Sequence, residues 1–366
     1  MSYKDRRNSK YGDIYDYDDS SKVNRNIPKK KKNLRIALYT LFIVFSLIFM
    51  FTGGAFIYAH SMLGNINYSS NEDDNLDAEY ISTDERDPKV LNVALFGVDR
   101  YTGDGEAKSR SDTILILSLD SRREKIKLLS IMRDTFVKIP GHKDNRINVA
   151  IALGGEKLAV KTIENNFGVK IDRYCTVDCE SFKEIIDIMG GIDVELTAKE
   201  AQHINKLGYE LNALLVKEGK EKYNITTIPE KDGEHHLSGI QALHYARSRK
   251  VPTANGLSDD FARTYRQRKV ISLVINKMRS CNISQILGII EKAGPYIKTN
   301  FNKNEIVSLA KNSLKYIKYD IEELRIPDLQ NVRNENKNGA SVLVIPDEAK
   351  AKYDIAKFIY EDSVQN

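Results

Sequence analysis

Charged side chains stand at the ends of three short apolar segments of strand length. They are Asp99 after VLNVALFGV (90–98), Asp112 before TILILSL (113–119) and Arg133 after IKLLSIM (126–132). The turn DSRREK joins the second and third segments, so a hairpin would bring Asp112 and Arg133 to one sheet edge, and Asp99 joins them if the first segment pairs likewise. Carboxylate oxygens suit Mg²⁺, which usually keeps waters and shares its shell with substrate phosphates. The pattern therefore predicts a metal site beside an arginine, and it leaves open plain salt bridges at a sheet edge.

Arginines on a predicted helix point toward the protein interior. Val270 and the apolar residues after it must face the core, and stepping back at about 100° per residue places three polar residues on the same stripe. These are Arg263, Arg266 and Gln267. Arg268 falls roughly opposite, so we expect it to face solvent. Buried guanidinium groups need anions, and the nearby sequence shows too few carboxylates to neutralise them. Phosphate oxygens are the predicted partner, because arginine binds them in a planar, bidentate way.

The segment before this helix, HYARSRK (244–250), adds two more arginines. Arg247 and Arg249 would share one face if the segment is extended. We expect the ring of His244 to be packed or exposed rather than to bind a ligand. A site of arginines and a metal would work by positioning and charge neutralisation, without a Ser-His-Asp or Cys-His set.

The elements that must position these residues alternate between strands and helices. Beyond the three strands above, strands are expected over 169–178, 192–197 and 341–345, and helices over 159–167, 182–189, 238–247, 259–279 and 303–317, with one more helix at the C-terminus. Residues 203–236 have weak periodicity and are expected to form a surface insertion. This alternation predicts an α/β fold, an α/β/α sandwich with a central mixed β-sheet.

The N-terminal part differs in composition. Residues 1–34 are polar and are expected to form a disordered cytoplasmic tail. Residues 35–59 contain a charge-free apolar run that is long enough to span a bilayer, which predicts one transmembrane signal-anchor helix. Basic residues just before this run place the N-terminus in the cytoplasm, by the positive-inside rule. Residues 60–87 then form an extracellular spacer, and 88–366 form an extracellular catalytic domain.

The net charge of +5 is a property of the tail. Residues 1–35 carry +6, so the rest of the chain carries −1. A folded part that is nearly neutral and lies outside the cell argues against nucleic-acid binding.

Seven short motifs occur in a fixed order behind the predicted membrane helix. They are GVDR (97–100), SRSDT (109–113), MRDTFVKIPG (132–141), RIN (146–148), MGGIDVEL (189–196), LSGIQALHYARSRK (237–250) and DDFARTYRQR (259–268). Together they resemble the LytR-CpsA-Psr family, strongly over 88–281 and more loosely beyond. The chain departs from the commonest family pattern at Met132, Val149 and Ala262.

The resemblance implies defined site residues. Asp99 and Asp112 would hold Mg²⁺, and together with Arg133 they would form the catalytic group. The diphosphate of the substrate would be bound by Arg110, Arg133, Arg146, Arg247, Arg249, Arg263, Arg266 and Gln267. A long apolar pocket would take the polyprenyl tail.

The resemblance also implies a reaction. A membrane-anchored enzyme of this family would transfer an anionic glycopolymer, teichoic-acid-like or capsular, from a polyprenyl diphosphate carrier to peptidoglycan. A hydroxyl of the acceptor would lose its proton to Asp99 or Asp112. A polyprenyl diphosphate hydrolase and a non-catalytic lipid-binding protein of the cell envelope are the alternatives that the sequence leaves open.

Overall fold

The computed structural model describes residues 67–68, 89–99, 110–316, 318–337 and 339–361. All of them belong to one compact unit, Tyr58–Asn366. The predicted tail and membrane helix, and most of the predicted spacer, lie outside the described residues. Within those residues, no helix combines the length and apolar composition that crossing a bilayer requires.

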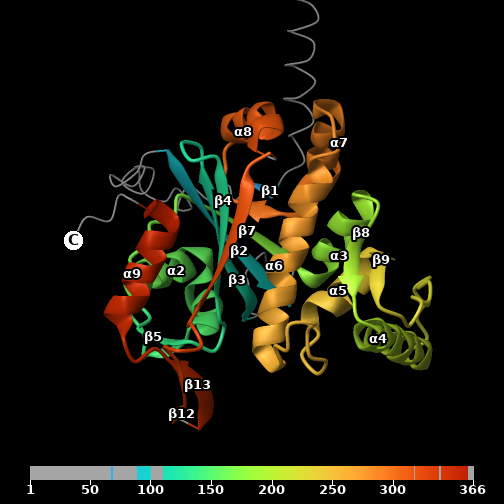
Figure 1. Ribbon diagram of the computed structural model, residues 1–366, viewed down its shortest axis with the longest axis horizontal. Helices are drawn as coiled ribbons and strands as arrows, with labels where there is room; N and C mark the ends of the chain where they lie inside the picture. The colour runs from blue at the N-terminus through green and yellow to red at the C-terminus, as the bar shows by residue number, and fades with distance from the viewer. Residues whose placement is uncertain (1–66, 69–88, 100–109, 317, 338, 362–366) are drawn as a thin grey trace, which may run out of the picture. The chain divides into compact units, whose positions relative to one another are not determined.

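A seven-stranded mixed sheet forms the centre of this unit (Figure 1). In order across the sheet its strands are β1 (Asn67–Tyr68), β10 (Lys298–Thr299), β7 (Arg173–Asp178), β2 (Val90–Val98), β3 (Ser111–Asp120), β4 (Lys125–Ile131) and β11 (Asp320–Ile326). β3 is antiparallel to both β2 and β4, whereas β7 and β11 run parallel to their neighbours β2 and β4. The predicted hairpin is therefore confirmed. β1 lies inside the segment predicted as a spacer, so the sheet begins before residue 88.

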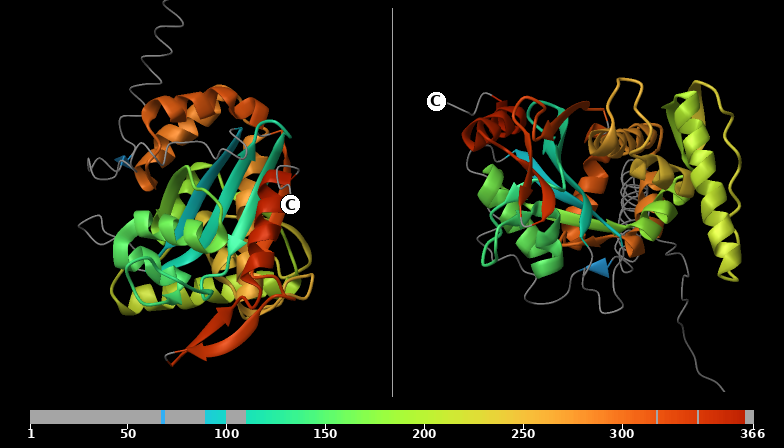
Figure 2. Two further views of the ribbon diagram at one scale, coloured as in Figure 1. Left: turned by 90° about the vertical axis from the view of Figure 1, so that its left-hand side faces the viewer. Right: turned by 90° about the horizontal axis from the view of Figure 1, so that it is seen from below.

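Helices cover both faces of the sheet (Figures 1 and 2). On one face α2 (Ala150–Phe167) and α9 (Glu348–Tyr360) contribute Ile163 and Ile359 to a core that contains Ile116 of β3. On the other face α6 (Asp259–Met278) and α8 (Lys303–Tyr316) pack Ile275 and Leu309 against Leu128 of β4. A mixed central sheet with helices on both faces is the predicted α/β architecture.

A second core lies beside α6 and does not involve the central sheet. Its elements are α3 (Cys179–Ile188), α4 (Ala198–Lys217), α5 (Gly239–Arg247) and the two-stranded sheet of β8 (Ile192–Leu196) and β9 (Gly233–Leu237). The strand expected over 192–197 thus forms outside the main sheet. The segment expected as a surface insertion, 203–236, continues α4 in its first half and ends in β9. The sequence signal for α4 was the capping box of Thr197 and Glu200.

Seven further elements lie in the described part of the chain. They are β5 (Phe136–Val137), β6 (Asn145–Arg146), η4 (Ile147–Val149), α7 (Ile283–Ala293), η5 (Gly294–Tyr296), β12 (Arg333–Lys337) and β13 (Ala340–Val344). β13 corresponds to the late strand expected over 341–345, and its ladder is with β12 rather than with the central sheet.

Candidate functional site

A β-bulge shapes the edge of the sheet where the predicted site lies. Gly97 pairs with Thr113 but Val98 pairs with Ser111, so Asp112 is an extra residue in β3. Gly97 permits this close approach, because a Cβ added there would lie 2.9 Å from the Thr113 Cβ. The bulge therefore takes Asp112 out of the regular alternation of side chains, at the same edge where β2 ends.

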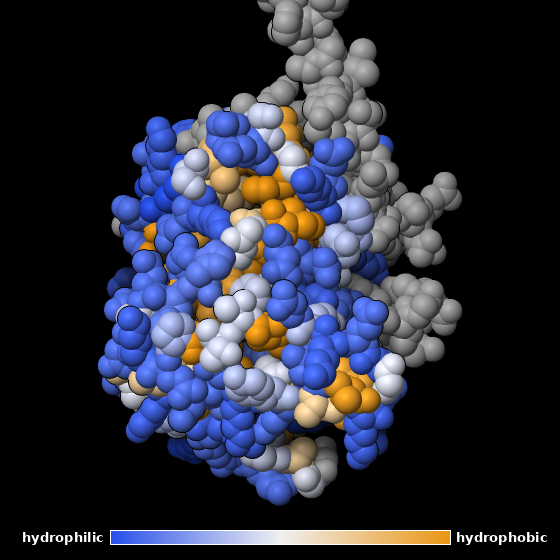
Figure 3. Space-filling view, turned by 90° about the vertical axis from the view of Figure 1, so that its right-hand side faces the viewer, coloured by the Kyte–Doolittle hydropathy of each residue, from blue (hydrophilic) through white to orange (hydrophobic). Residues whose placement is uncertain are grey.

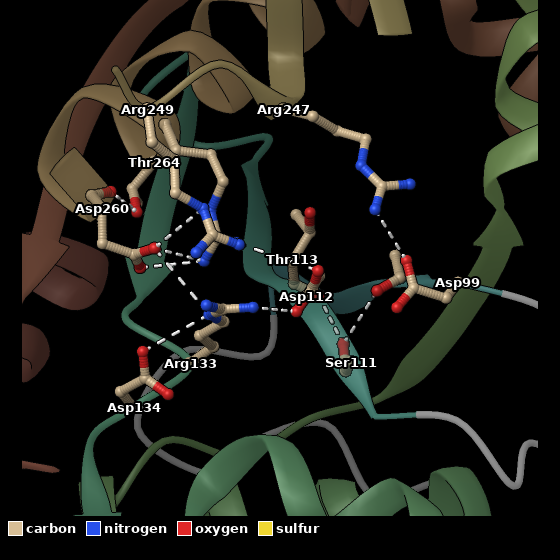
Figure 4. A network of polar contacts seen from close by, with 12 residues as sticks. Asp99, Ser111, Asp112, Thr113, Arg133, Asp134, Arg247, Arg249, Asp260 and Thr264 are labelled. Carbon is tan, nitrogen blue, oxygen red and sulfur yellow. Dashed lines mark hydrogen bonds and ion pairs between the residues drawn. The ribbon is translucent and has the colours of Figure 1, made fainter. Parts of the chain in front are cut away.

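Asp112 forms an ion pair with Arg133, as the hairpin predicted (Figure 4). Burial opposes ionisation of Asp112, but Arg133 and then Arg263 and Arg249 outweigh it and hold the pKa of this carboxyl below its ordinary value. Burial likewise opposes the charge of Arg133, whereas Asp112 raises its pKa. Both groups are therefore charged at neutral pH.

Asp260, in the first turn of α6, is the centre of the arginine cluster. Its Oδ1 lies 2.7 Å from Nη2 of Arg263, 3.7 Å from Nε of Arg249 and 3.8 Å from Nε of Arg133. Sequence reasoning missed this residue, although it stands three positions before Arg263, within reach across one helical turn. One carboxylate thus gathers three of the predicted arginines around a common point (Figure 4).

Arg263 is buried with unused donors. Its side chain is 3% exposed, and its Nε and Nη1 make no hydrogen bond to any described residue. Nη1 is 3.8 Å from Oδ2 of Asp112. Burial, together with the charges of Arg133 and Arg249, lowers the pKa of Arg263. Buried donors normally have partners, so this arrangement is that of a site which needs an additional anion.

Asp99 lies at the same sheet edge but in a different ion pair. Its Oδ1 is 3.1 Å from Nη2 of Arg247, and both side chains are about half exposed, at 49% each. Nη1 of Arg247 donates to the Cys179 thiol sulfur at 2.9 Å. Burial raises the pKa of this thiol. The predicted site is therefore divided into an Asp99–Arg247 half and a half centred on Asp112 and Asp260.

Three predicted residues lie further from this centre. Arg146 donates to Asp134 at 3.0 Å, and Asp134 also lies 3.4 Å from Nε of Arg133, so Arg146 contacts the cluster through a carboxylate. Arg110 is exposed at the start of β3, and Gln267 is half-buried on α6. No interaction of these last two with the cluster is present in the described part of the chain.

The sequence profile of the LytR_cpsA_psr family matches residues 55–356. The chain belongs to this family. It is similar to the polyisoprenyl-teichoic acid–peptidoglycan teichoic acid transferase TagV of Bacillus subtilis, with 35% identity over 225 residues, which cover 60% of this chain and 52% of TagV. The match thus spans about half the length of TagV.

Two further similarities extend over more of the related protein. TagU of Bacillus licheniformis carries the same transferase description as TagV. It is 35% identical to this chain over 263 residues, which cover 70% of this chain and 74% of TagU. The crystal structure of B. subtilis TagV has a TM-score of 0.56 and 30% identity, and the match covers 74% of this chain and 97% of that chain. The mixed sheet and flanking helices of this chain therefore agree with the fold of that family member.

One arginine that the family resemblance assigned to the diphosphate has protein partners instead. Arg266 is fully buried and donates to Glu200 Oε1 at 2.7 and 3.1 Å, to the Ser248 carbonyl at 3.1 Å and to the Val251 carbonyl at 2.8 Å. Glu200 of α4 is thus a nearby carboxylate for this arginine, contrary to the expectation from the sequence. We correct its role to structural support of the 248–251 segment.

Arg268 is also buried, which corrects the expectation that it faces solvent. Its Nε donates to Glu323 at 2.9 Å and its Nη1 to the Ser130 hydroxyl at 3.0 Å. α6 is contacted on two sides, since Val270 packs into the second core and Ile271 against the sheet. A helix buried on two sides has no single solvent face, so one apolar stripe could not place Arg268 correctly.

The donor set around Asp99 and Asp112 fits part of a magnesium shell. Both carboxylates lie at one sheet edge, and Mg²⁺ uses one or two carboxylates together with waters and substrate phosphates. The residues that the structure describes contain no cluster of three or more Asp, Glu, His or Cys that could enclose a metal alone. Asp99 and Asp112 would therefore supply at most two oxygen ligands of such an ion.

Proposed function

We propose that this protein transfers a teichoic-acid-like anionic glycopolymer from a polyprenyl diphosphate carrier to peptidoglycan. The family and the names of the TagV and TagU relatives support this reaction class. The observation that carries the proposal is the arginine cluster around Asp260, where buried Arg263 keeps two donors free of any described partner. A diphosphate supplies several anionic oxygens for such donors.

The proposed step is a phosphoryl transfer. An acceptor hydroxyl oxygen attacks the phosphorus that carries the sugar, the bond from that phosphorus to the bridging oxygen breaks, and polyprenyl monophosphate leaves with that oxygen. Catalysis of this kind depends mainly on positioning and charge neutralisation. The charge on the diphosphate oxygens would be neutralised by the three arginines that meet at Asp260, because their guanidinium groups lie close to one another. These are Arg133, Arg249 and Arg263.

The hydroxyl proton requires an acceptor among the carboxylates. Asp112 is a weak base, because its arginine neighbours stabilise its anion and lower its pKa. Asp99 is half exposed and pairs with one arginine, so it is the better-placed acceptor of the two. His244 is unsuitable, because burial, Arg247 and His203 lower its pKa to about 4.

Mg²⁺ is part of the proposal. Asp99 and Asp112 would hold it, and the ion would supply positive charge to the diphosphate oxygens when bound. The arginines described above act on the same oxygens through the protein's own donors.

The proposed location follows from the sequence. We propose a single-pass protein of the cell membrane, in which one helix over 35–59 is the anchor, the N-terminus is cytoplasmic and the domain is extracellular. A cavity of about 410 Å³ lies at the start of β2, at the opposite end of this strand from Asp99. Its lining combines Leu91, Leu119 and Phe301 with charged residues, so it would give apolar contact only to the far part of a polyprenyl chain.

The reaction can be tested directly. Purified full-length protein is incubated with a synthetic polyprenyl-diphosphate-linked saccharide, peptidoglycan and Mg²⁺, and saccharide bound to the wall is measured. Covalent attachment supports the transferase. Release of free saccharide phosphate with no attachment would favour the hydrolase, and binding with no turnover would favour the lipid-binding alternative.

A further inference from the structure

A cavity of about 620 Å³ lies outside the arginine cluster, between α4 and the segment that follows Arg249. Lys199 and Lys206 line it from α4, and Lys250 lines it from the segment. His203 and Tyr209 lie on the same wall. We call this cavity the α4 pocket. None of its residues belongs to the catalytic or diphosphate-binding groups described above.

The lining of the α4 pocket has more basic than acidic residues, since its three lysines face two carboxylates, Glu210 and Glu230. Lys199 and Lys250 form no ion pair with a described residue, and Lys206 is 3.8 Å from Glu210 in an exposed pair. Burial lowers the pKa of His203, and the positive charges of Arg266, Lys206 and Lys250 lower it further. Glu210 opposes these three cations, so positive charge only predominates around the ring of His203.

The pocket also presents an aromatic ring. Tyr209 is 64% exposed. Its hydroxyl lies 3.1 Å from the Thr227 hydroxyl, and this hydrogen bond fixes the tyrosine ring at the edge of the pocket. Exposed aromatic faces pack against the apolar faces of sugar rings, while their polar ends remain in water. The side of the molecule on which α4 lies is mostly hydrophilic (Figure 3). Lysines beside an exposed tyrosine match a saccharide that carries negative charge.

One extended segment separates the pocket from the arginine cluster. Arg266 fixes this segment by binding the Ser248 and Val251 carbonyls together with Glu200 of α4. The charges of Arg247, at the end of the same helix, and of His203 in the pocket both act on His244, so α5 adjoins the Asp99–Arg247 pair as well as the pocket. An acceptor hydroxyl must reach the diphosphate itself, whereas the chain of the donor extends away from it. The separation therefore favours the donor.

We propose that the α4 pocket binds the phosphate-bearing saccharide chain of the donor beyond its diphosphate. This inference rests on the proposed function, because it assigns a second contact to the same substrate. It makes polymer length a determinant of affinity, since only a donor long enough to pass the 248–251 segment can use the lysines.

The test replaces two unpaired lysines of the pocket. Lys199→Ala/Lys250→Ala is compared with Lys217→Ala/Lys222→Ala, which removes the same charge from exposed positions outside the pocket. Binding of a lipid-free glycerol phosphate oligomer to full-length protein is measured by calorimetry. We expect Kd to rise roughly 5-fold to 30-fold in the pocket variant, as for two exposed charge contacts, and to change less than about twofold in the control.

Two donors distinguish failure of this inference from failure of the proposed function. One donor carries a disaccharide without phosphate repeats, and the other carries several glycerol phosphate units. The pocket variant should raise KM for the long donor and leave kcat/KM for the short donor unchanged, with an unchanged Tm. Equal oligomer affinity in the wild type and the pocket variant, or equal losses in the pocket variant and the control variant, would overturn the inference. If wild-type protein transfers neither donor, the proposed function fails while the oligomer measurement still decides the pocket.

Discussion

Arg263 and Arg266 lie one turn apart on α6, and their removal should have opposite consequences. Arg266 is fully buried and its partner Glu200 is 6% exposed, so Arg266→Ala leaves a buried carboxylate without its cation. Removing one partner of a buried pair costs about 3 to 5 kcal/mol. Glu200 still accepts from the Thr197 backbone at 3.0 Å, so we expect the lower end, about 3 kcal/mol. At roughly 2 °C per kcal/mol for a domain of this size, Tm should fall by about 6 °C.

Arg263→Ala should instead weaken ligand binding. The arginine loses its contact with Asp260, but the repulsion that Arg133 and Arg249 exert on it also disappears, so Tm without ligand should stay near that of the wild type. Charge-assisted hydrogen bonds contribute about 1.5 to 3 kcal/mol each, so affinity for a short polyprenyl diphosphate should fall roughly 10-fold to 150-fold. The increase in Tm on adding that ligand should then be lost.

Thermal unfolding with and without the diphosphate separates the two roles. Lys269→Ala is the control on the same helix, since Lys269 is half-buried and pairs with no described residue. A wild-type Tm for Arg266→Ala combined with lost binding would refute our reassignment of this residue. A large drop in Tm for Arg263→Ala in the absence of ligand would show that its free donors do not mark a binding site.

Three further predictions concern the metal, acid stability and topology. Asp99→Asn should abolish divalent-dependent turnover with an unchanged Tm, and full activity in chelator would contradict the metal assignment. Burial would raise the pKa of Glu361, but Lys127 and then Lys125 outweigh this effect and lower it from 4.5 to about 2. The stabilisation that Glu361 provides is therefore present above its ordinary pKa and is lost as pH falls through about 2. Glu361→Gln should flatten the fall of Tm over that pH range, and an unchanged slope would argue against these ion pairs. Protease added to intact wall-stripped cells should remove the domain and spare the N-terminal tail, whereas a protected domain would refute the external location.

Local rules predicted the sheet edge well. A hairpin turn and strand pairing are set by neighbouring residues, so the meeting of Asp112 with Arg133 followed from the four-residue turn between β3 and β4. The bulge that displaces Asp112 could not be predicted from alternation, because Gly97 makes room for Thr113 only once the two strands are paired.

Partners distant in sequence were the main source of error. The helical phase of Arg266 was right, since it points inward, but Glu200 lies 66 residues earlier on a helix that weak periodicity concealed. For Arg268 the partner Glu323 comes from β11, a strand that was not predicted. Periodicity indicates that an arginine side chain points inward, whereas the carboxylate or other anion that it meets there is determined by tertiary contacts.

The position of Asp260 among three arginines also bears on how a ligand would enter and leave. Its carboxylate acts as an internal counter-ion, so an arriving diphosphate takes over guanidinium contacts that are already made rather than meeting bare charges. The attraction is thereby moderated, and affinity depends on the difference between two anions. A monophosphate offers fewer oxygens than a diphosphate, so the aspartate competes with it more successfully. The same carboxylate that lowers affinity for the donor would in this way speed release of the spent carrier.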